Sequence, residues 1–167
     1  MMPYLLVLAL GLAALVQVSL LPVLRVAGVS PNLTLMVITA WALLRGGRSA
    51  VIWALVAGLW LDLLSSQWFG VYTLGLLTAA YLAGLASQTV YRPSIWLALG
   101  MAAAVTVVQA GIQLALLLVS GGALALSDTL LRLVAPEIVY NSIVMLAVYP
   151  VLSWINRVTG QERLPVE

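Results

Sequence analysis

The stretch Gly58-Leu-Trp-Leu-Asp62-Leu-Leu-Ser-Ser-Gln-Trp-Phe-Gly70 places one carboxylate inside an otherwise apolar run. A charged side chain in such a run is unfavourable unless it has a hydrated exit or a partner. Gly58 stands four residues before Asp62 and Gly70 stands eight residues after it, and the two glycines frame a helix, a turn and a second helix. The stretch therefore predicts a membrane-embedded helical hairpin and not a soluble active site.

The composition of the whole chain agrees with that interpretation. Hydrophobic residues make up 64% of the 167 residues and charged residues 7%, whereas a soluble domain carries about 25% charged residues. A helix needs about 20 apolar residues to cross a bilayer core of about 30 Å. Six such spans would use most of the chain. We therefore expect an all-α integral membrane protein, a single domain over residues 1–167 folded as a compact bundle of six transmembrane helices.

Missing residue types narrow the possible functions. The chain has no His and no Cys, so the commonest general base and the thiolate metal ligands are absent. All seven basic residues are Arg, and a Walker-type phosphate loop cannot be completed without Lys. The net charge of +2 is scattered along the chain and indicates no nucleic-acid surface. We expect neither catalysis nor a bound metal or cofactor.

Hydropathy and turn residues define the candidate spans, which fall at about 3–24, 32–44, 49–64, 71–90, 94–119 and 138–156. The first is predicted to be a retained span, because it lacks the basic start of a cleaved signal and is longer than a signal's apolar region. The second has thirteen residues, which at about 1.5 Å each give about 20 Å, too little to cross alone. Pro31 and Asn32 suit the N-terminus of that helix.

The distribution of Arg predicts the orientation in the membrane. If the N-terminus is cytoplasmic, the inner connections hold five Arg and the outer ones two, in agreement with the positive-inside rule. The even number of spans then places the C-terminus inside as well. The inner group is Arg45, Arg48, Arg92, Arg157 and Arg163, and the outer group is Arg25 and Arg132.

The outer connection before the last span predicts a short interfacial helix at about 127–135. Ser127 and Asp128 suit its N-terminus, and Asp128 with Arg132 makes an i,i+4 ion pair. Its apolar side would lie in the plane of the membrane interface. A plain surface connector is the alternative.

Asp62 lies about one turn from the predicted outer end of its span, where the helix dipole disfavours a negative charge. Two kinds of group could offset that charge: the guanidinium of Arg25 or Arg132, or backbone N–H groups of the turn at 65–70. In the second case Asp62 locks the turn between two helices. The other interpretation is a direct contact with a ligand or partner, and the sequence leaves both open.

Small residues surround this hairpin. Gly70 and Gly75 would allow a tight turn and a close approach of two backbones. Ala54, Gly58 and Asp62 follow at intervals of four and share one face of a helix, which is a weak signal for helix contact because alanine is abundant in this chain.

The fifth span carries a polar stripe, made of Thr106, Gln109 and Gln113 at i, i+3 and i+7. The sixth span adds Asn141, and the first adds Gln17. Polar side chains in lipid turn towards the bundle interior. They are interpreted either as hydrogen bonds that join helices or as the lining of a polar cavity for a small ligand or a partner peptide.

Two groups of residues resemble the rod shape-determining protein MreD family. One is Pro31-Asn32-Leu33 at the start of the second span. The other is the series Gly58, Asp62, Gly70, Gly75 and Tyr81, followed by Arg92 in an inner loop. The likeness extends along the whole chain in motif order and hydropathy. The family more often has Asp than Asn after the first proline, so a charge-dependent role at Asn32 does not carry over.

The resemblance implies a non-catalytic subunit of the bacterial cell-elongation complex in the inner, cytoplasmic membrane. Such a subunit would bind the transmembrane anchor of MreC. It would thereby help to couple cytoskeletal MreB to peptidoglycan synthesis by RodA and a class B transpeptidase. On this interpretation Pro31, Asn32, Asp62 and Gly70 fix the partner-binding shape.

A rival interpretation comes from the six-span architecture, which is similar to the substrate-binding S components of energy-coupling-factor vitamin transporters. Fold likeness alone carries no function. The outer connections lack a rich polar lid, which counts against a vitamin-binding subunit. A proton-coupled pump would need ionisable groups at mid-membrane depth, and the sequence predicts none there.

Overall fold

The computed structural model describes Leu15, Gln17 and Ser19 together with residues 30–65, 69–89, 94–119 and 134–158. In this part of the chain the regular elements are all helices, which confirms the all-α prediction. They are α2 (Leu33–Arg45), α3 (Gly47–Leu64), α4 (Val71–Thr89), α5 (Ile95–Val119) and α7 (Ala135–Val158). Each begins and ends within three residues of a range expected from hydropathy and turn chemistry. Most of the span at 3–24 and most of the interfacial helix at 127–135 lie outside the described residues.

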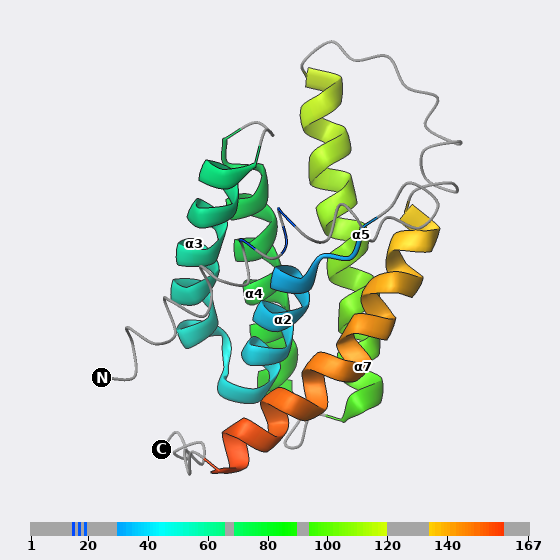
Figure 1. Cartoon of the computed structure of the whole chain (residues 1–167). Helices are drawn as coiled ribbons and strands as arrows, with labels where there is room; N and C mark the ends of the chain where they lie inside the picture. Colours follow the sequence, from blue (N-terminus) through cyan, green and yellow to red (C-terminus); the bar gives the residue numbers. More distant parts are fainter. Residues whose placement is uncertain are drawn as a thin grey trace.

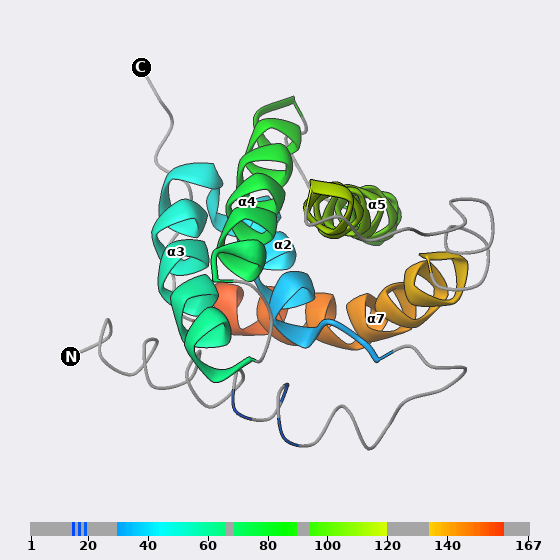
Figure 2. The same ribbon diagram turned by 90° about the horizontal axis from the view of Figure 1, so that it is seen from above.

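The central element is the shortest of these helices. Seen from above, α2 lies among α3, α4, α5 and α7 (Figure 2). Its buried side chains include Leu35, Met36, Ile38 and Leu43, each 0–1% exposed. The longer helices contribute mainly small residues to this core, such as Ala54 and Ala102. Small residues let helix backbones approach closely around a central apolar helix.

The thirteen residues of α2 are too few to cross a bilayer core alone, as expected. Figure 1 shows that α2 begins part-way along the neighbouring helices, so its N-terminus lies inside the bundle. At its other end Gly46 alone joins α2 to α3. Gly46 has φ +91°, a left-handed conformation that glycine adopts without a steric penalty.

Helices α3 and α4 approach each other through glycine. A Cβ atom on Gly84 would lie 2.5 Å from the Cα of Gly47, and a Cβ on Gly47 would lie 3.0 Å from the Cα of Gly84. Because both closest atoms belong to the backbone, no side-chain movement could make room for a methyl group here. The contact lies at the end of the hairpin opposite Asp62 and fixes how near the two helices run.

Three described helices are long and apolar enough to cross a membrane: Gly47–Leu64, Ile95–Leu116 and Ala135–Val158. Large apolar side chains point outward from them, with Leu63 70% and Trp154 66% exposed. A soluble protein rarely exposes so many large apolar groups, whereas lipid covers them favourably. The described helices therefore support a membrane-embedded fold, while the bundle of six spans stays a prediction.

Candidate functional site

Asp62 in the last turn of α3 is buried, and its carboxylate binds the start of α4. Oδ1 accepts a hydrogen bond from the N–H of Tyr72 at 3.0 Å, and Oδ2 accepts from the N–H of Thr73 at 3.2 Å and from the Thr73 hydroxyl. These N–H groups lie in the first turn of α4 and have no partner within that helix. The positive end of the α4 dipole also favours a carboxylate. This favourable interaction offsets the unfavourable one between the Asp62 carboxylate and the negative end of the α3 dipole.

The geometry of the turn explains how Asp62 reaches α4. Gly70 has φ +98°, and its carbonyl accepts the first intrahelical hydrogen bond of α4, from the N–H of Leu74 at 2.9 Å. One alternative had expected the donors to Asp62 to be N–H groups within the 65–70 turn. They lie just past that turn, at Tyr72 and Thr73. The other expected partners, Arg25 and Arg132, lie outside the described residues.

Gly58 makes room for this arrangement. A Cβ atom on Gly58 would lie 2.5 Å from the Cα of Thr73, so any other residue would push the start of α4 away from α3. Gly58 is one turn before Asp62 on the same side of the helix. The absence of a side chain at Gly58 thus brings Thr73 within hydrogen-bonding distance of the carboxylate.

Asn32 forms a second polar group at the start of α2. Its Oδ1 accepts hydrogen bonds from the N–H of Leu35 at 3.1 Å and from Nε2 of Gln17 at 2.8 Å. Its own N–H donates to Oδ1 of Asn141 at 2.8 Å. The N-cap role expected of Asn32 is therefore present, and Pro31 beside it is buried.

The same group extends to α5. Nδ2 of Asn141 donates to Oγ1 of Thr106 at 3.0 Å, and the Thr106 hydroxyl donates to the carbonyl of Ala102 at 2.7 Å. Oε1 of Gln17 accepts from the N–H of Thr34 at 2.7 Å. The first predicted span, α2, α5 and α7 are thus joined by one hydrogen-bonded cluster, which we call the Asn32 cluster: Gln17, Asn32, Thr106 and Asn141.

Gln109, one turn after Thr106 on α5, is 1% exposed and lies against Gly75 of α4. A Cβ atom on Gly75 would fall 1.4 Å from Oε1 of Gln109. Gly75 therefore leaves space for the amide of Gln109. Among the described residues, neither Oε1 nor Nε2 of this amide has a hydrogen-bond partner.

The remaining residues of the expected site are not brought together with these groups. Gln113 is exposed on α5, so it does not line the interior with Thr106 and Gln109. Tyr81 is 61% exposed on α4. Arg92 lies outside the described residues.

The opposite end of the described bundle is basic. Nε of Arg45 donates to Oδ1 of Asn156 at 2.8 Å, and the guanidinium lies 4.6 Å from the ring centre of Trp41. The bond to Asn156 places the end of α2 beside the end of α7. Arg48 in the first turn of α3 and Arg157 in the last turn of α7 belong to the same end of the molecule.

Sequence reasoning missed three participants: Thr73, the Gly47–Gly84 contact and Asn156. Thr73 and Gly84 sit in an apolar helix without a distinctive pattern. Gly47 and Asn156 lie at helix ends, where polar and small residues are ordinary. Only their spatial neighbours give them a role, so no local signal could have identified them.

The structure offers no preformed metal centre in its described part, where no three His, Cys, Asp or Glu residues gather. Its polar groups instead join helices to one another. Long apolar helices with a hydrogen-bonded interior define the class of multi-pass helical membrane proteins.

Over residues 1–158 the chain matches the family of the rod shape-determining protein MreD, and it belongs to that family. The predicted family is confirmed, and with it a role in determining rod shape. Searches among curated proteins and among solved structures found no significant match.

Proposed function

We propose that the chain is a non-catalytic scaffold of the cell-elongation complex in the bacterial inner membrane. In this role it crosses the membrane six times, as a single domain with both termini in the cytoplasm. It binds the transmembrane anchor of MreC. It thereby helps to couple MreB filaments to peptidoglycan synthesis by RodA and a class B transpeptidase.

The family match over nearly the whole chain carries this proposal. The arrangement of the buried polar groups supports a scaffold. Asp62 is the one charged side chain among the buried residues described, and it is bound to the start of α4. A carboxylate held by helix N–H groups is suited to fixing shape, because its charge is already matched.

We assign the partner-binding shape to the half of the bundle that holds the start of α2 and the α3–α4 turn. Pro31 and Asn32 set the start of α2 there, while Asp62 and Gly70 set the start of α4. Gly58 and Gly75 hold the neighbouring helices close. Tyr81, exposed on α4, and Arg92 are further contact candidates from the family motif.

Co-purification tests the proposal. The full chain is co-expressed with an MreC protein and the pair is passed over a size-exclusion column in detergent. We expect one co-eluting complex, and we expect it to be lost when the MreC anchor is replaced by an unrelated transmembrane helix. Separate elution of the two proteins would contradict the scaffold role. Co-elution instead with an ATPase module and a bound vitamin would support the transporter alternative.

A matched pair of variants tests whether the Asn32 cluster contributes to the partner-binding shape. Asn141→Ala removes the acceptor for the Asn32 N–H and the donor to Thr106, so the start of α2 loses its tie to α7. We expect weaker co-elution with MreC. Gln113→Leu on the exposed side of α5 is the control and should leave co-elution unchanged. If both variants co-eluted with MreC to the same extent, the Asn32 cluster would have no part in the partner-binding shape.

A further inference from the structure

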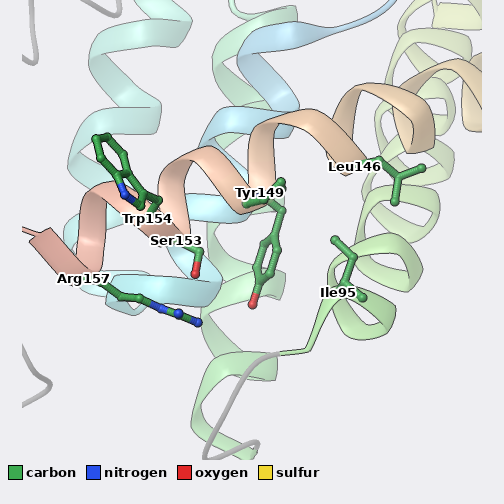
Figure 3. Close-up of a pocket in the computed structure, with 7 residues that line it drawn as sticks. Ile95, Leu146, Tyr149, Ser153, Trp154 and Arg157 are labelled. Atoms are coloured by element: carbon green, nitrogen blue, oxygen red, sulfur yellow. The ribbon is translucent and has the colours of Figure 1, made fainter.

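A groove of about 420 Å³ lies between the first turn of α5 and the second half of α7. Figure 3 labels six of its lining residues: Ile95, Leu146, Tyr149, Ser153, Trp154 and Arg157. It uses none of the residues of the Asn32 cluster and none of those around Asp62. Its volume is within the range of small-molecule sites in proteins.

The groove is apolar at one end and polar at the other. Leu146 and Ile95 form the apolar part, while the side chains of Ser153 and Arg157 point to the same side of α7 as the ring of Tyr149 (Figure 3). Leu146 precedes Arg157 by about three helical turns. Since Arg157 stands in the last turn of this candidate span, the polar end lies towards the membrane surface and Leu146 lies deeper.

The charge at this end of the molecule is positive. Its described charged side chains are the arginines Arg45, Arg48 and Arg157, whereas the described carboxylates, Asp62 and Glu137, belong to the opposite ends of their helices. Within the described part of the chain, Arg157 has no carboxylate partner. The positive end of the α5 dipole, at Ile95, adds to the same field.

We infer that this groove binds an anionic phospholipid of the inner leaflet, with the phosphate at Arg157 and Ser153 and an acyl chain along Leu146 and Ile95. The match of charge is the argument for this occupant. Basic pockets between helices on the cytoplasmic side bind anionic headgroups. An apolar helix from a partner protein would fill the deep part of the groove but leave the guanidinium of Arg157 without a complementary charge.

Native mass spectrometry of the purified full chain, titrated with phosphatidylglycerol or phosphatidylcholine, tests the inference. We expect preferential retention of phosphatidylglycerol. Arg157→Gln should reduce that retention about fivefold, equivalent to the value of about 1 kcal/mol for one basic residue near a membrane surface. Arg157→Lys should retain most of it. Equal retention of the two lipids by the unaltered chain would overturn the proposal.

Two further variants separate a groove from general surface attraction. Arg48→Gln removes an exposed arginine at the same end that does not line the groove, and it should leave retention unchanged. Leu146→Trp fills the apolar part while keeping every arginine, and it should lower retention. An equal loss in Arg48→Gln and Arg157→Gln, or no loss in Leu146→Trp, would refute the site. The measurement uses the chain without MreC, so its failure would leave the proposed scaffold role untouched.

Discussion

Asp62 illustrates how one buried carboxylate can be stable in a membrane helix. Its three hydrogen bonds come from two consecutive residues at the start of the next helix. Hydrogen bonds to a charged group are stronger than those between neutral groups. Asp62 therefore stabilises the α3–α4 connection through its charge as well as its shape.

Asp62→Asn keeps the shape of the side chain and removes the charge. We expect the free energy of unfolding to fall by about 1–2 kcal/mol, the range for loss of a helix cap or a dipole contact. Thermal unfolding in detergent measures the change. Thr73→Val is the matched control, because it removes only the hydroxyl bond and should lower stability less. An unchanged transition in Asp62→Asn would rule out an electrostatic contribution.

Gly75 and Gln109 form a second residue-level pair. Gly75→Ala should destabilise the protein by about 1–3 kcal/mol, the usual range for overpacking, because the buried amide must move from its present position. Gln109→Ala removes the obstructing atoms. In a double-mutant cycle we expect the two changes to couple by about 1 kcal/mol or more. Additive effects would mean that the amide moves aside freely.

At the scale of helices, the sequence was informative about where each one begins and ends. Hydrophobic runs interrupted by residues such as Gly46 and Pro93 define these limits locally. It was less informative about which helices meet. The bond between Asn32 and Asn141 joins residues 109 positions apart, and no local pattern encodes such a distance.

The polar stripe of α5 shows a related limit. The spacing of Thr106, Gln109 and Gln113 fixes one side of a helix, and the first two residues are buried as expected. Gln113 is exposed because α5 extends beyond its neighbours at this end (Figure 1). Periodicity gives the direction of a side chain around the helix axis but not how far the adjacent helices reach along it.

The contact between Gly47 and Gly84 predicts a strong effect of a single methyl group. Gly84→Ala would place Cβ 2.5 Å from a backbone atom, so α3 and α4 must separate. We expect a loss of about 2 kcal/mol or more in thermal unfolding. Gly111→Ala on α5 is the control: its Cβ would meet open space, and the higher helix propensity of alanine favours it by up to about 1 kcal/mol. Equal stability of the two variants would contradict this account.

At the scale of the whole molecule, the described arginines gather at one end while Asp62 lies at the other. The positive-inside rule then predicts the orientation of the bundle, with the α2–α3 junction in the cytoplasm and the α3–α4 turn outside. The sequence alone already gives this prediction, because successive connections between spans lie on alternate sides of the membrane and the positions of the arginines can be read directly from the chain.

The absence of Cys from the chain makes this orientation directly testable. Single cysteines are introduced as Arg48→Cys and Phe69→Cys, both at exposed positions. A membrane-impermeant maleimide added to cells with a permeabilised outer membrane should label Phe69→Cys only. After lysis it should label both. Labelling of Arg48→Cys before lysis would place the arginines outside and contradict the assigned orientation.

The single-residue link at Gly46 has a consequence for how the protein is made. A helix of thirteen residues cannot remain across a bilayer by itself, and one residue leaves no slack between α2 and the eighteen residues of α3. We therefore expect the two to enter the membrane as one pair. The unit of insertion at this point of the chain would then be the α2–α3 pair and not either helix by itself.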